Sequence, residues 1–373
     1  MIDRQIRVRL LGRRPRPSEP LSVTAPFTLT ETRTGTQFGD TQSPLSGVTV
    51  RPASSAGIQL GEKLIPSDDI LLTPSRDAAL VLADKTYRGA MRIQRQGDGV
   101  VFTNHLDIES YLRGVLRGEL PRYFHFESFK AQCVAARTYA LYCKREKPAG
   151  TTFDVYDDEG SQVYNGVTME DPVSDRAVQE TRGEVAVYHD GKSEDIFCTY
   201  YSSCCGGLSQ HVNNVKPNDP PVAPLVGGVA CNDCYVAPRY RWGPETLSRA
   251  EVTKRLTARY PTIRKIGTVT ELKPRKRTTD GRVISIEIVG SGGQREVLVG
   301  EDFRLSIGSR VLKSTNFQIE TTKDGFVFKD GKGFGHGMGL CQYGMETKAR
   351  RGMNYRDILA AYYPGSTVKK LYD

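Results

Sequence analysis

The hydrophobic pattern changes its period near residue 107, and this change limits what the chain can fold into. Residues 5–10 alternate apolar and polar side chains, which is the period of a half-buried strand. Residues 69–104 contain further strand-like runs. From Asp107 onward, apolar residues recur at helical spacing. The pattern, together with 37 glycines and 20 prolines that favour turns, predicts an α+β fold with a β-rich N-terminal part and a mixed core, in which a few helices surround a cleft.

The length of 373 residues suggests two or three domains, at roughly 150 residues per domain. We expect a β-rich module over residues 1–104 and a second domain over residues 105–373. Strand-like patterns with intervening turns return late in the second domain. They predict a β-rich insertion at about 245–325.

Local signals place the helices. Asp107 can cap a helix that runs toward Leu116 and is stopped by Pro121. A second helix is expected over about 127–145, where apolar residues, including Cys133 and Cys143, repeat at helical spacing and form one buried face. Further helices are predicted at residues 171–182, 245–259 and 354–362.

The net charge of +9 admits nucleic acid or an anionic polymer as a partner. The basic runs at 13–16, 273–277 and 348–351 carry no nucleic-acid-binding motif, so no nucleic-acid partner is expected. Solvated surface charge is the simpler interpretation of these runs, and attraction to an anionic cell-wall polymer is the alternative. No transmembrane segment is predicted, and no export signal is visible at the start of the sequence.

Five of the eight cysteines lie between Cys198 and Cys234, and two of them form a C-x-x-C motif at 231–234. This clustering is more typical of a metal site than of a disulfide framework. Cys133 and Cys143, on the second helix, are expected to be buried thiols.

Six blocks in order make the chain resemble the SpoIID/LytB family, named after stage II sporulation protein D. The blocks cover roughly residues 100–373 and read ESYLRGVLRGELP (109–121), KAQCVAARTYA (130–140), QVYNG (162–166), DRAV with TRG (175–183), YSSCCGG (201–207) and GFGHGMGLCQYG (333–344).

The resemblance implies a function in bacterial cell walls. The sporulation member of the family is a lytic transglycosylase, which cuts the MurNAc–GlcNAc glycan strands of peptidoglycan and prefers strands without stem peptides. Its catalytic glutamate matches Glu119, and residues 105–373 would form the catalytic domain. The resemblance also implies an extracytoplasmic location and a cell-wall amidase as a partner. The alternative is a non-catalytic wall-binding protein that enhances an amidase, as the LytB half of the family name suggests.

Lytic transglycosylases need only one carboxyl group, which serves first as acid and then as base while the sugar's C6 hydroxyl closes a 1,6-anhydro ring. Ordinary glycosidases use two carboxylates. Candidates for a second carboxylate here are Asp157, Asp158 and Glu159, which resemble a polar turn. We therefore expect 1,6-anhydroMurNAc ends, and no cofactor is needed for this chemistry.

Other residues in the matching blocks are candidate substrate contacts. They are polar residues in strand, turn or glycine-rich contexts: Gln162, Tyr164, Ser202, Ser203, His336 and Gln342. Local structural hydrogen bonds are an equal alternative for the first four. For Arg137 and Tyr139, on the second helix, a structural role is expected at least as much as a substrate contact. Cys341, five residues after His336, could act as a nucleophile, but nothing else resembles a cysteine hydrolase.

A subset of the family carries Cys-Gly-Gly-His followed by a later C-x-x-C, and this chain matches it except that Leu208 replaces the histidine. The match implies a structural zinc held by Cys205, Cys231 and Cys234. Tetrahedral zinc requires a fourth ligand. Cys204 is the expected one, with Cys198 and His211 as alternatives. A disulfide joining Cys231 to Cys234 or to Cys205 remains the competing interpretation.

Overall fold

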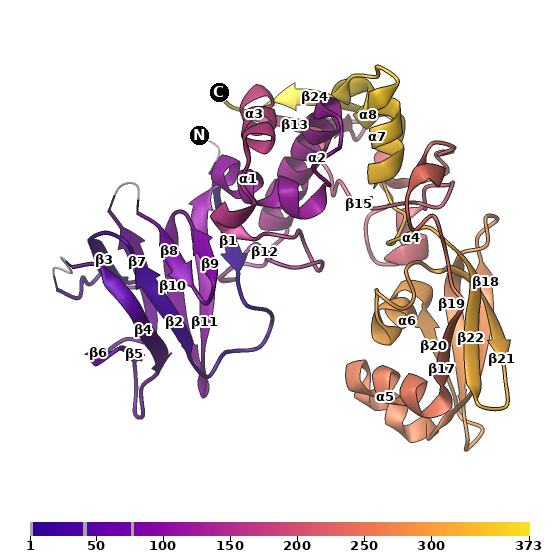
Figure 1. Cartoon of the computed structure of the whole chain (residues 1–373), viewed down its shortest axis with the longest axis horizontal. Coiled ribbons are helices and arrows are strands. Elements are labelled where there is room, and N and C mark those ends of the chain that lie inside the picture. Colours follow the sequence, from indigo (N-terminus) through magenta and orange to yellow (C-terminus); the bar gives the residue numbers. More distant parts are fainter. Residues whose placement is uncertain (1–2, 40–42, 76–77) are drawn as a thin grey trace. The chain divides into compact units, whose positions relative to one another are not determined.

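The computed structural model describes residues 3–39, 43–75 and 78–373 and divides into two compact units. Unit 1 is formed by Met1–Val185 with Lys369–Asp373, and unit 2 by Ala186–Val368. Both units combine helices and sheets, which confirms the predicted α+β class (Figure 1). The expectation about an export signal concerns the start of the sequence, of which Met1 and Ile2 lie outside the described residues.

Unit 1 contains two six-stranded sheets. In the first, β1 pairs in parallel with β12 and all other neighbours are antiparallel. Its order is β12 (Val155–Tyr156), β1 (Gln5–Arg9), β11 (Gly99–Asp107), β10 (Ala90–Gln96), β7 (Asp69–Pro74) and β3 (Phe27–Glu31). The second is antiparallel, in the order β6 (Lys63–Ile65), β5 (Ile58–Leu60), β4 (Leu45–Pro52), β2 (Glu19–Val23), β8 (Leu80–Leu82) and β9 (Lys85–Tyr87).

The alternation in the sequence builds these sheets. Ile6 and Val8 of β1 are fully buried, as are Met91 and Ile93 of β10, while Gln5 is exposed. Because β12 pairs with β1, strands from both sides of residue 104 share one sheet. The division of the sequence into domains at residue 104 stays a prediction.

The helices of unit 1 follow the strands. They are α1 (Ile108–Glu119), α2 (Phe126–Arg145) and α3 (Pro172–Glu180), with a 3-10 turn η1 (Gly166–Met169). Asp107 caps α1 and Asp171 caps α3, each accepting a backbone N–H of the first turn. The strand β13 (Glu184–His189) then crosses into unit 2, where it forms a sheet with β14 (Glu194–Ile196) and β24 (Ser366–Lys370).

Unit 2 contains a β-rich part with its own core. Phe303, Phe317 and Phe328 are buried there with Val252 and Leu256 of α5, and α5 and α6 lie on one side of the strands (Figure 1). The elements are β16 (Arg241–Trp242), β17 (Glu245–Ser248), α5 (Arg249–Arg259), η4 (Pro261–Ile266), β18 (Val269–Arg277), β19 (Val283–Gly290), β20 (Arg295–Val299), α6 (Gly300–Ile307), β21 (Asn316–Thr321) and β22 (Gly325–Lys332).

The rest of unit 2 is built from short elements. The strands β15 (Tyr201–Ser202) and β23 (Leu340–Cys341) pair in parallel. The helical elements are α4 (Val212–Val215), η2 (Ala223–Leu225), η3 (Cys234–Val236), α7 (Gln342–Arg350) and α8 (Tyr355–Tyr362).

Four of the five predicted helices agree with the structure within a few residues. The helix predicted at 245–259 begins only at Arg249, since Glu245–Ser248 pairs with β22 as a strand and Ser248 then caps the helix. The helix α6 was not predicted; it interrupts a segment that was expected to contain strands and turns.

Candidate active site and cysteine cluster

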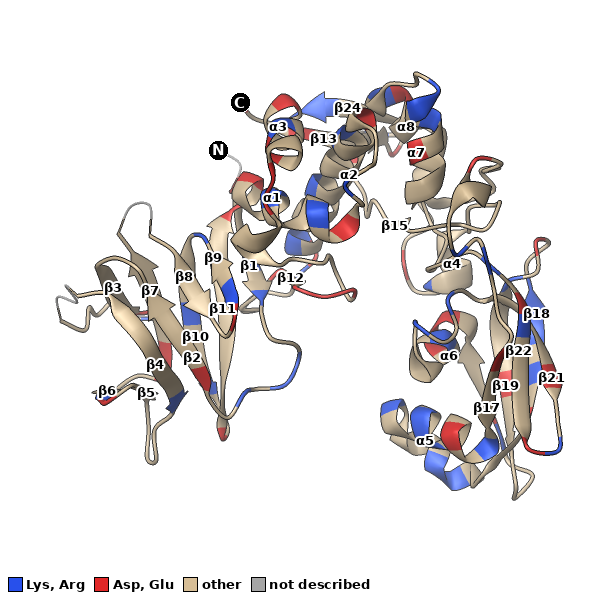
Figure 2. Cartoon of the chain, viewed as in Figure 1, with Lys and Arg blue, Asp and Glu red and all other residues tan. Residues whose placement is uncertain are grey.

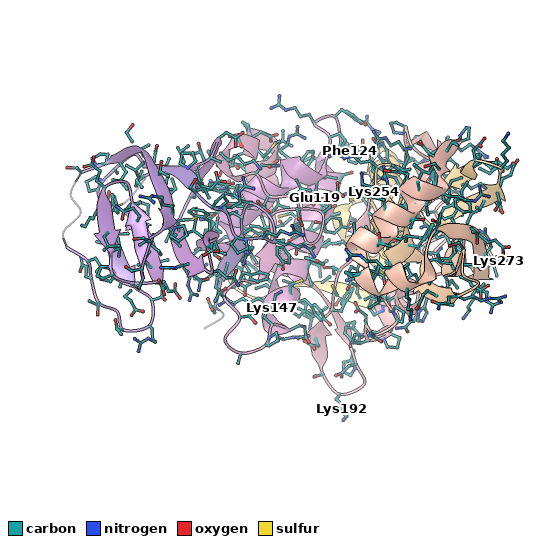
Figure 3. The ribbon with its side chains drawn as sticks, turned by 90° about the horizontal axis from the view of Figure 1, so that it is seen from below. Glu119, Phe124, Lys147, Lys192, Lys254 and Lys273 are labelled. Atoms are coloured by element: carbon teal, nitrogen blue, oxygen red, sulfur yellow. The ribbon has the colours of Figure 1, made fainter. Side chains whose placement is uncertain are left out.

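Helix α1 ends at Glu119 for local reasons. Leu120 precedes Pro121, which disfavours a helical conformation, and its backbone is extended with φ of −118°. Arg117 in the last turn forms an ion pair of 2.7 Å with Asp171, the cap of α3. Glu119 is therefore the last helical residue. Figure 3 labels it together with Phe124, which lies in the turn between α1 and α2.

The half-buried Glu119 is held by the backbone of a distant segment. The Val163 N–H donates to Glu119 Oε1 at 2.8 Å. The approach is close because α1 carries glycines on this side. A Cβ at Gly118 would lie 2.5 Å from the Val163 carbonyl oxygen, and one at Gly114 would lie 2.7 Å from the Tyr164 ring. Any side chain at either position would push this segment away from α1.

Gln162 and Tyr164, which flank Val163, are buried. Tyr111 of α1 donates from its hydroxyl to Gln162 Oε1 at 3.0 Å, and Gln162 Nε2 donates to the Ala136 carbonyl at 3.3 Å. Tyr164 donates to Asn104 Oδ1 at 2.9 Å. Both side chains thus fix the segment that holds Glu119. A direct substrate contact by either one stays a prediction.

The acidic turn at residues 157–159 is also tied to the fold. Asp157 Oδ2 accepts the Leu11 N–H at 3.0 Å, and its backbone carbonyl accepts the Tyr164 N–H at 3.2 Å. Burial raises the pKa of Asp157 above its ordinary value. Asp158 Oδ1 accepts the Gly160 N–H at 2.8 Å, which is the polar turn expected from the sequence.

A buried ion pair not anticipated from the sequence lies inside unit 1. Arg137 Nη2 contacts Glu109 Oε2 at 2.7 Å, and Tyr372 donates to Glu109 Oε1 at 2.7 Å. The Gly183 N–H donates to the same oxygen at 3.2 Å. Burial raises the pKa of Glu109, but the Arg137 charge and these hydrogen bonds outweigh it and hold the pKa below the usual range. Arg137 thus has the structural role that was expected for it.

In unit 2, the pairing of β15 with β23 brings Ser202 next to Cys341. Ser202 Oγ accepts the Gly337 N–H at 3.2 Å and so contacts the glycine-rich segment around His336. Ser203 accepts the Tyr343 N–H through its carbonyl at 3.1 Å. Gln342 is buried at the start of α7. Substrate contacts by these residues stay predictions.

His336 is a neutral imidazole at neutral pH. Desolvation lowers its pKa to about 4, and its Nδ1 accepts the Met338 N–H at 3.0 Å, which places the proton on Nε2. The ring lies edge-to-face with Tyr200, with centroids 5.8 Å apart.

Four buried cysteines lie together in unit 2, with their Sγ atoms all within 4.8 Å of one another. They form the cysteine cluster: Cys205, Cys231, Cys234 and Cys341. Cys205 and Cys234 sulphurs are 3.8 Å apart. Tetrahedral zinc with Zn–S bonds of about 2.3 Å separates its sulphurs by roughly 3.8 Å. The cluster therefore has the donor type, the number of ligands and the spacing that such an ion requires.

The fourth member of the cluster is Cys341, whereas the sequence analysis expected Cys204 as the fourth ligand. Cys204 follows an extended path paired with Phe334, and its thiol lies 3.6 Å from the Cys234 carbonyl oxygen, to which it donates. The Cys204 thiol also interacts with the thiols of Cys234 and Cys341, so Cys204 lies beside the cluster and its role as the fourth ligand stays a prediction. All eight cysteines lie in the described part of the chain and are free thiols, so the alternative disulfides are not formed.

Arg282 of unit 2 was not anticipated. Its buried guanidinium donates to the Cys205 carbonyl at 2.6 Å and to the carbonyls of Gly335 and His336, each at 3.3 Å. It therefore ties the cysteine cluster to the glycine-rich segment. Nothing in the local sequence marks this arginine, because its partners, three backbone carbonyls and the Thr315 hydroxyl, lie far along the chain.

Among the residues that the structure describes, no helix is both long and apolar enough to cross a membrane.

Comparison with protein families gives two matches. A family model described as Stage II sporulation protein matches residues 96–188, which include Glu119 and Val163. A model described as Domain of unknown function (DUF8618) matches residues 231–339, which include Cys231, Cys234 and His336.

Three relatives cover most of the chain. An uncharacterized protein of Brachyspira hyodysenteriae is 34% identical over 76% of this chain and 72% of its own length. The amidase enhancer of Bacillus subtilis is 29% identical over 69% of this chain, but only 40% of that longer protein is covered. The stage II sporulation protein D of Bacillus subtilis is 25% identical over 71% of this chain and 75% of its own length.

Proposed function

We propose that this chain, which belongs to the stage II sporulation protein D family, cuts peptidoglycan glycan strands as a lytic transglycosylase with Glu119 as its single acid and base. The observation that carries the proposal is the placement of Glu119. It ends α1, is half-buried, and has one carboxyl oxygen fixed by the Val163 amide. A fixed and partly desolvated carboxyl suits a group that must both donate and accept a proton.

The Val163 hydrogen bond assigns separate roles to the two oxygens. A backbone N–H can only donate, so Oε1 must accept in both protonation states and the catalytic proton is carried on Oε2. Oε2 first protonates the glycosidic oxygen, whose bond to C1 breaks. It then takes the proton of the C6 hydroxyl as that oxygen bonds to C1. The acid is regenerated, and the two product strands together retain every atom of the substrate: one ends in a 1,6-anhydro ring and the other carries the former glycosidic oxygen as a hydroxyl.

We infer a substrate of MurNAc–GlcNAc strands without stem peptides and a site of action outside the cytoplasm, in the cell wall. These inferences rest on the family, in which one relative is named for sporulation and another as an amidase enhancer. A cell-wall amidase is the partner that the second name suggests for this chain. Strands that lack stem peptides are what an amidase leaves behind.

The cysteine cluster would hold zinc with a structural role. Four buried thiolates would repel one another without a cation, and a metal with four sulphur ligands has no open position for a substrate. The ion would join the segments around Cys205, Cys231–Cys234 and Cys341, and so fix the glycine-rich segment that precedes Cys341. The four sulphurs and their spacing support this assignment.

Replacement of Glu119 tests the catalytic proposal. Glu119→Gln keeps the side-chain volume and an oxygen that can accept the Val163 N–H, but it cannot exchange a proton. We expect cleavage of purified peptide-free strands to fall by about 10²- to 10⁴-fold with strand binding retained. Glu146→Gln, at an exposed position after α2, is the matched control and should cleave at the normal rate. Wild-type rates for Glu119→Gln would refute the assignment.

The amidase-enhancer relative supports a second candidate function, in which the chain binds the wall without cutting it. Stimulation of a purified cell-wall amidase separates the two. An enhancer acts equally well with Glu119→Gln, whereas a transglycosylase loses its own products with that change.

A further inference from the structure

Two segments of unit 2 form a ribbon at the end of β22 that carries positive charge. Arg241 of β16 lies directly opposite Lys332 of β22 in an antiparallel register. The guanidinium carbon of Arg239 lies 5.1 Å from the ring centroid of Phe334. We call this set the basic ribbon: Arg239, Arg241, Lys332 and Phe334.

The ribbon has one face toward the core and one away from it. Trp242 is buried, and its ring covers Gly331 so closely that a Cβ there would clash with it. Because consecutive strand residues point to opposite faces, Arg241 and Lys332 lie on the face away from Trp242. Arg239 and Arg241 are exposed, and Lys332 is half-buried.

The charges on this face are not compensated by acids. Like charges directly opposite one another destabilise a sheet, yet none of the three cations forms an ion pair with a carboxylate in the part of the chain that the structure describes. The surrounding segment, residues 231–339, holds 20 basic and 12 acidic residues, a net charge of +8 out of +9 for the chain. Figure 2 shows the same excess on α5 and β18. A row of cations of this kind is complementary to an anionic ligand.

The side chains of the basic ribbon indicate the chemical class of its ligand. Two guanidinium groups and an ammonium group recognise a carboxylate, and the aromatic ring beside them offers a surface for the C–H face of a sugar. A carboxylate borne directly by a saccharide satisfies both features. In peptidoglycan, the lactyl group of muramic acid is such a carboxylate only when no stem peptide is attached, because the peptide converts it to an uncharged amide.

We propose that the basic ribbon binds the lactyl carboxylate of peptide-free muramic acid and so selects strands without stem peptides. This inference rests on the proposed function for its substrate class. Its test measures binding, which does not require that the chain cut anything.

The experiment compares affinities for three forms of one glycan strand: peptide-free, peptide-bearing, and peptide-free with the lactyl carboxylates converted to amides. Proteins are the wild type, Arg241→Gln, and the double variant Arg239→Gln with Arg241→Gln. The matched control is Lys254→Gln with Arg264→Gln, which removes the same charge from exposed positions on α5 and η4; Figure 3 labels Lys254. Metal content and thermal unfolding are measured for every variant.

We expect the wild type and the control to bind peptide-free strands about tenfold more tightly than amidated strands. Peptide-bearing strands should bind like amidated ones, because their lactyl groups are amides too. Tight binding of peptide-bearing strands would mean that the ligand is a carboxylate of the peptide, and it would overturn the lactyl assignment. The double variant should bind all three forms equally. Arg241→Gln should reduce the affinity ratio between peptide-free and amidated strands to about the square root of its wild-type value.

Three other results would overturn the inference. Equal losses in the double variant and the control would mean that only overall charge matters, and equally tight wild-type binding of single-stranded DNA would have the same meaning. In the third result, a ribbon variant keeps the wild-type preference for peptide-free over amidated strands and loses metal. That result would show that the cations only compensate the negative charge of the cysteine cluster. If the double variant does not fold, Arg241→Gln decides, because it changes one exposed side chain and leaves Arg239 on the Phe334 ring in place.

Discussion

The backbone N–H of Val163 donates to Glu119 Oε1 across 2.8 Å, and this contact joins the last residue of α1 to a segment 44 positions later in the chain. The segment is itself held by Tyr111, which donates to Gln162, and by the absence of side chains at Gly114 and Gly118. The carboxyl group is therefore oriented by the fold around it, so substitutions at other residues of α1 should also change its activity.

Gly118→Ala should reduce strand cleavage without removing a chemical group. The new Cβ would lie 2.5 Å from the Val163 carbonyl oxygen, so the segment must shift and carry the Val163 N–H away from Glu119. We expect a destabilisation of about 1–3 kcal/mol from overpacking and a fall in kcat with little change in KM. Gly292→Ala, at a position with open space around it, is the control. Unchanged kcat in Gly118→Ala would mean that the orientation of Glu119 does not depend on this contact.

The Glu109–Arg137 pair predicts how stability changes with pH. Since the folded-state pKa of Glu109 lies below its ordinary value of 4.5, its contribution is fully present above pH 4.5 and is lost as pH falls through the lower folded-state value. Urea unfolding of the wild type between pH 7 and pH 3 should show this loss, and Glu109→Gln should flatten that part of the profile.

Removal of Arg137 is expected to lower the free energy of unfolding by more than the ion pair itself contributes to it. Arg137→Met leaves the Glu109 carboxylate buried without its cation, with an expected destabilisation of about 3–5 kcal/mol at pH 7. A smaller cost at pH 3 than at pH 7 is part of the prediction, because protonated Glu109 no longer needs the cation. A destabilisation independent of pH would point to lost packing alone.

The cysteine cluster should bind one zinc ion per chain, with Cys341 and not Cys204 as the fourth ligand. Elemental analysis of the purified protein tests the stoichiometry. Cys341→Ser should lower the zinc content or weaken its retention against a chelator, and Cys204→Ser should keep it. The opposite outcome for these two variants would restore the ligand set expected from the sequence.

The sequence predicts those features whose causes are local. The helix cap at Asp107 lies where the sequence places it, because a capping side chain contacts the backbone only two or three residues away. Three members of the cysteine cluster were also predicted, since Cys231 and Cys234 form one C-x-x-C motif and Cys205 belongs to a recognisable block.

Features that depend on distant pairing escaped prediction. Cys341 reaches the cluster through the parallel pairing of β15 with β23, which joins residues near 202 and 341. The burial of Gln162 and Tyr164 follows from the glycines on α1, and no periodicity in their own segment shows it. Arg282 binds the Thr315 hydroxyl and backbone carbonyls from two remote loops, so its sequence neighbours contain no signal.

The mass of the cleavage product tests the central claim most directly. Purified peptide-free strands are digested in water enriched in heavy oxygen, and the new ends are analysed by mass spectrometry. A single carboxyl acting with the C6 hydroxyl predicts 1,6-anhydroMurNAc ends, lighter than a reducing end by one water and free of the heavy isotope. Reducing MurNAc ends that carry heavy oxygen at C1 would contradict the account and show that a hydrolase with a second carboxylate is at work.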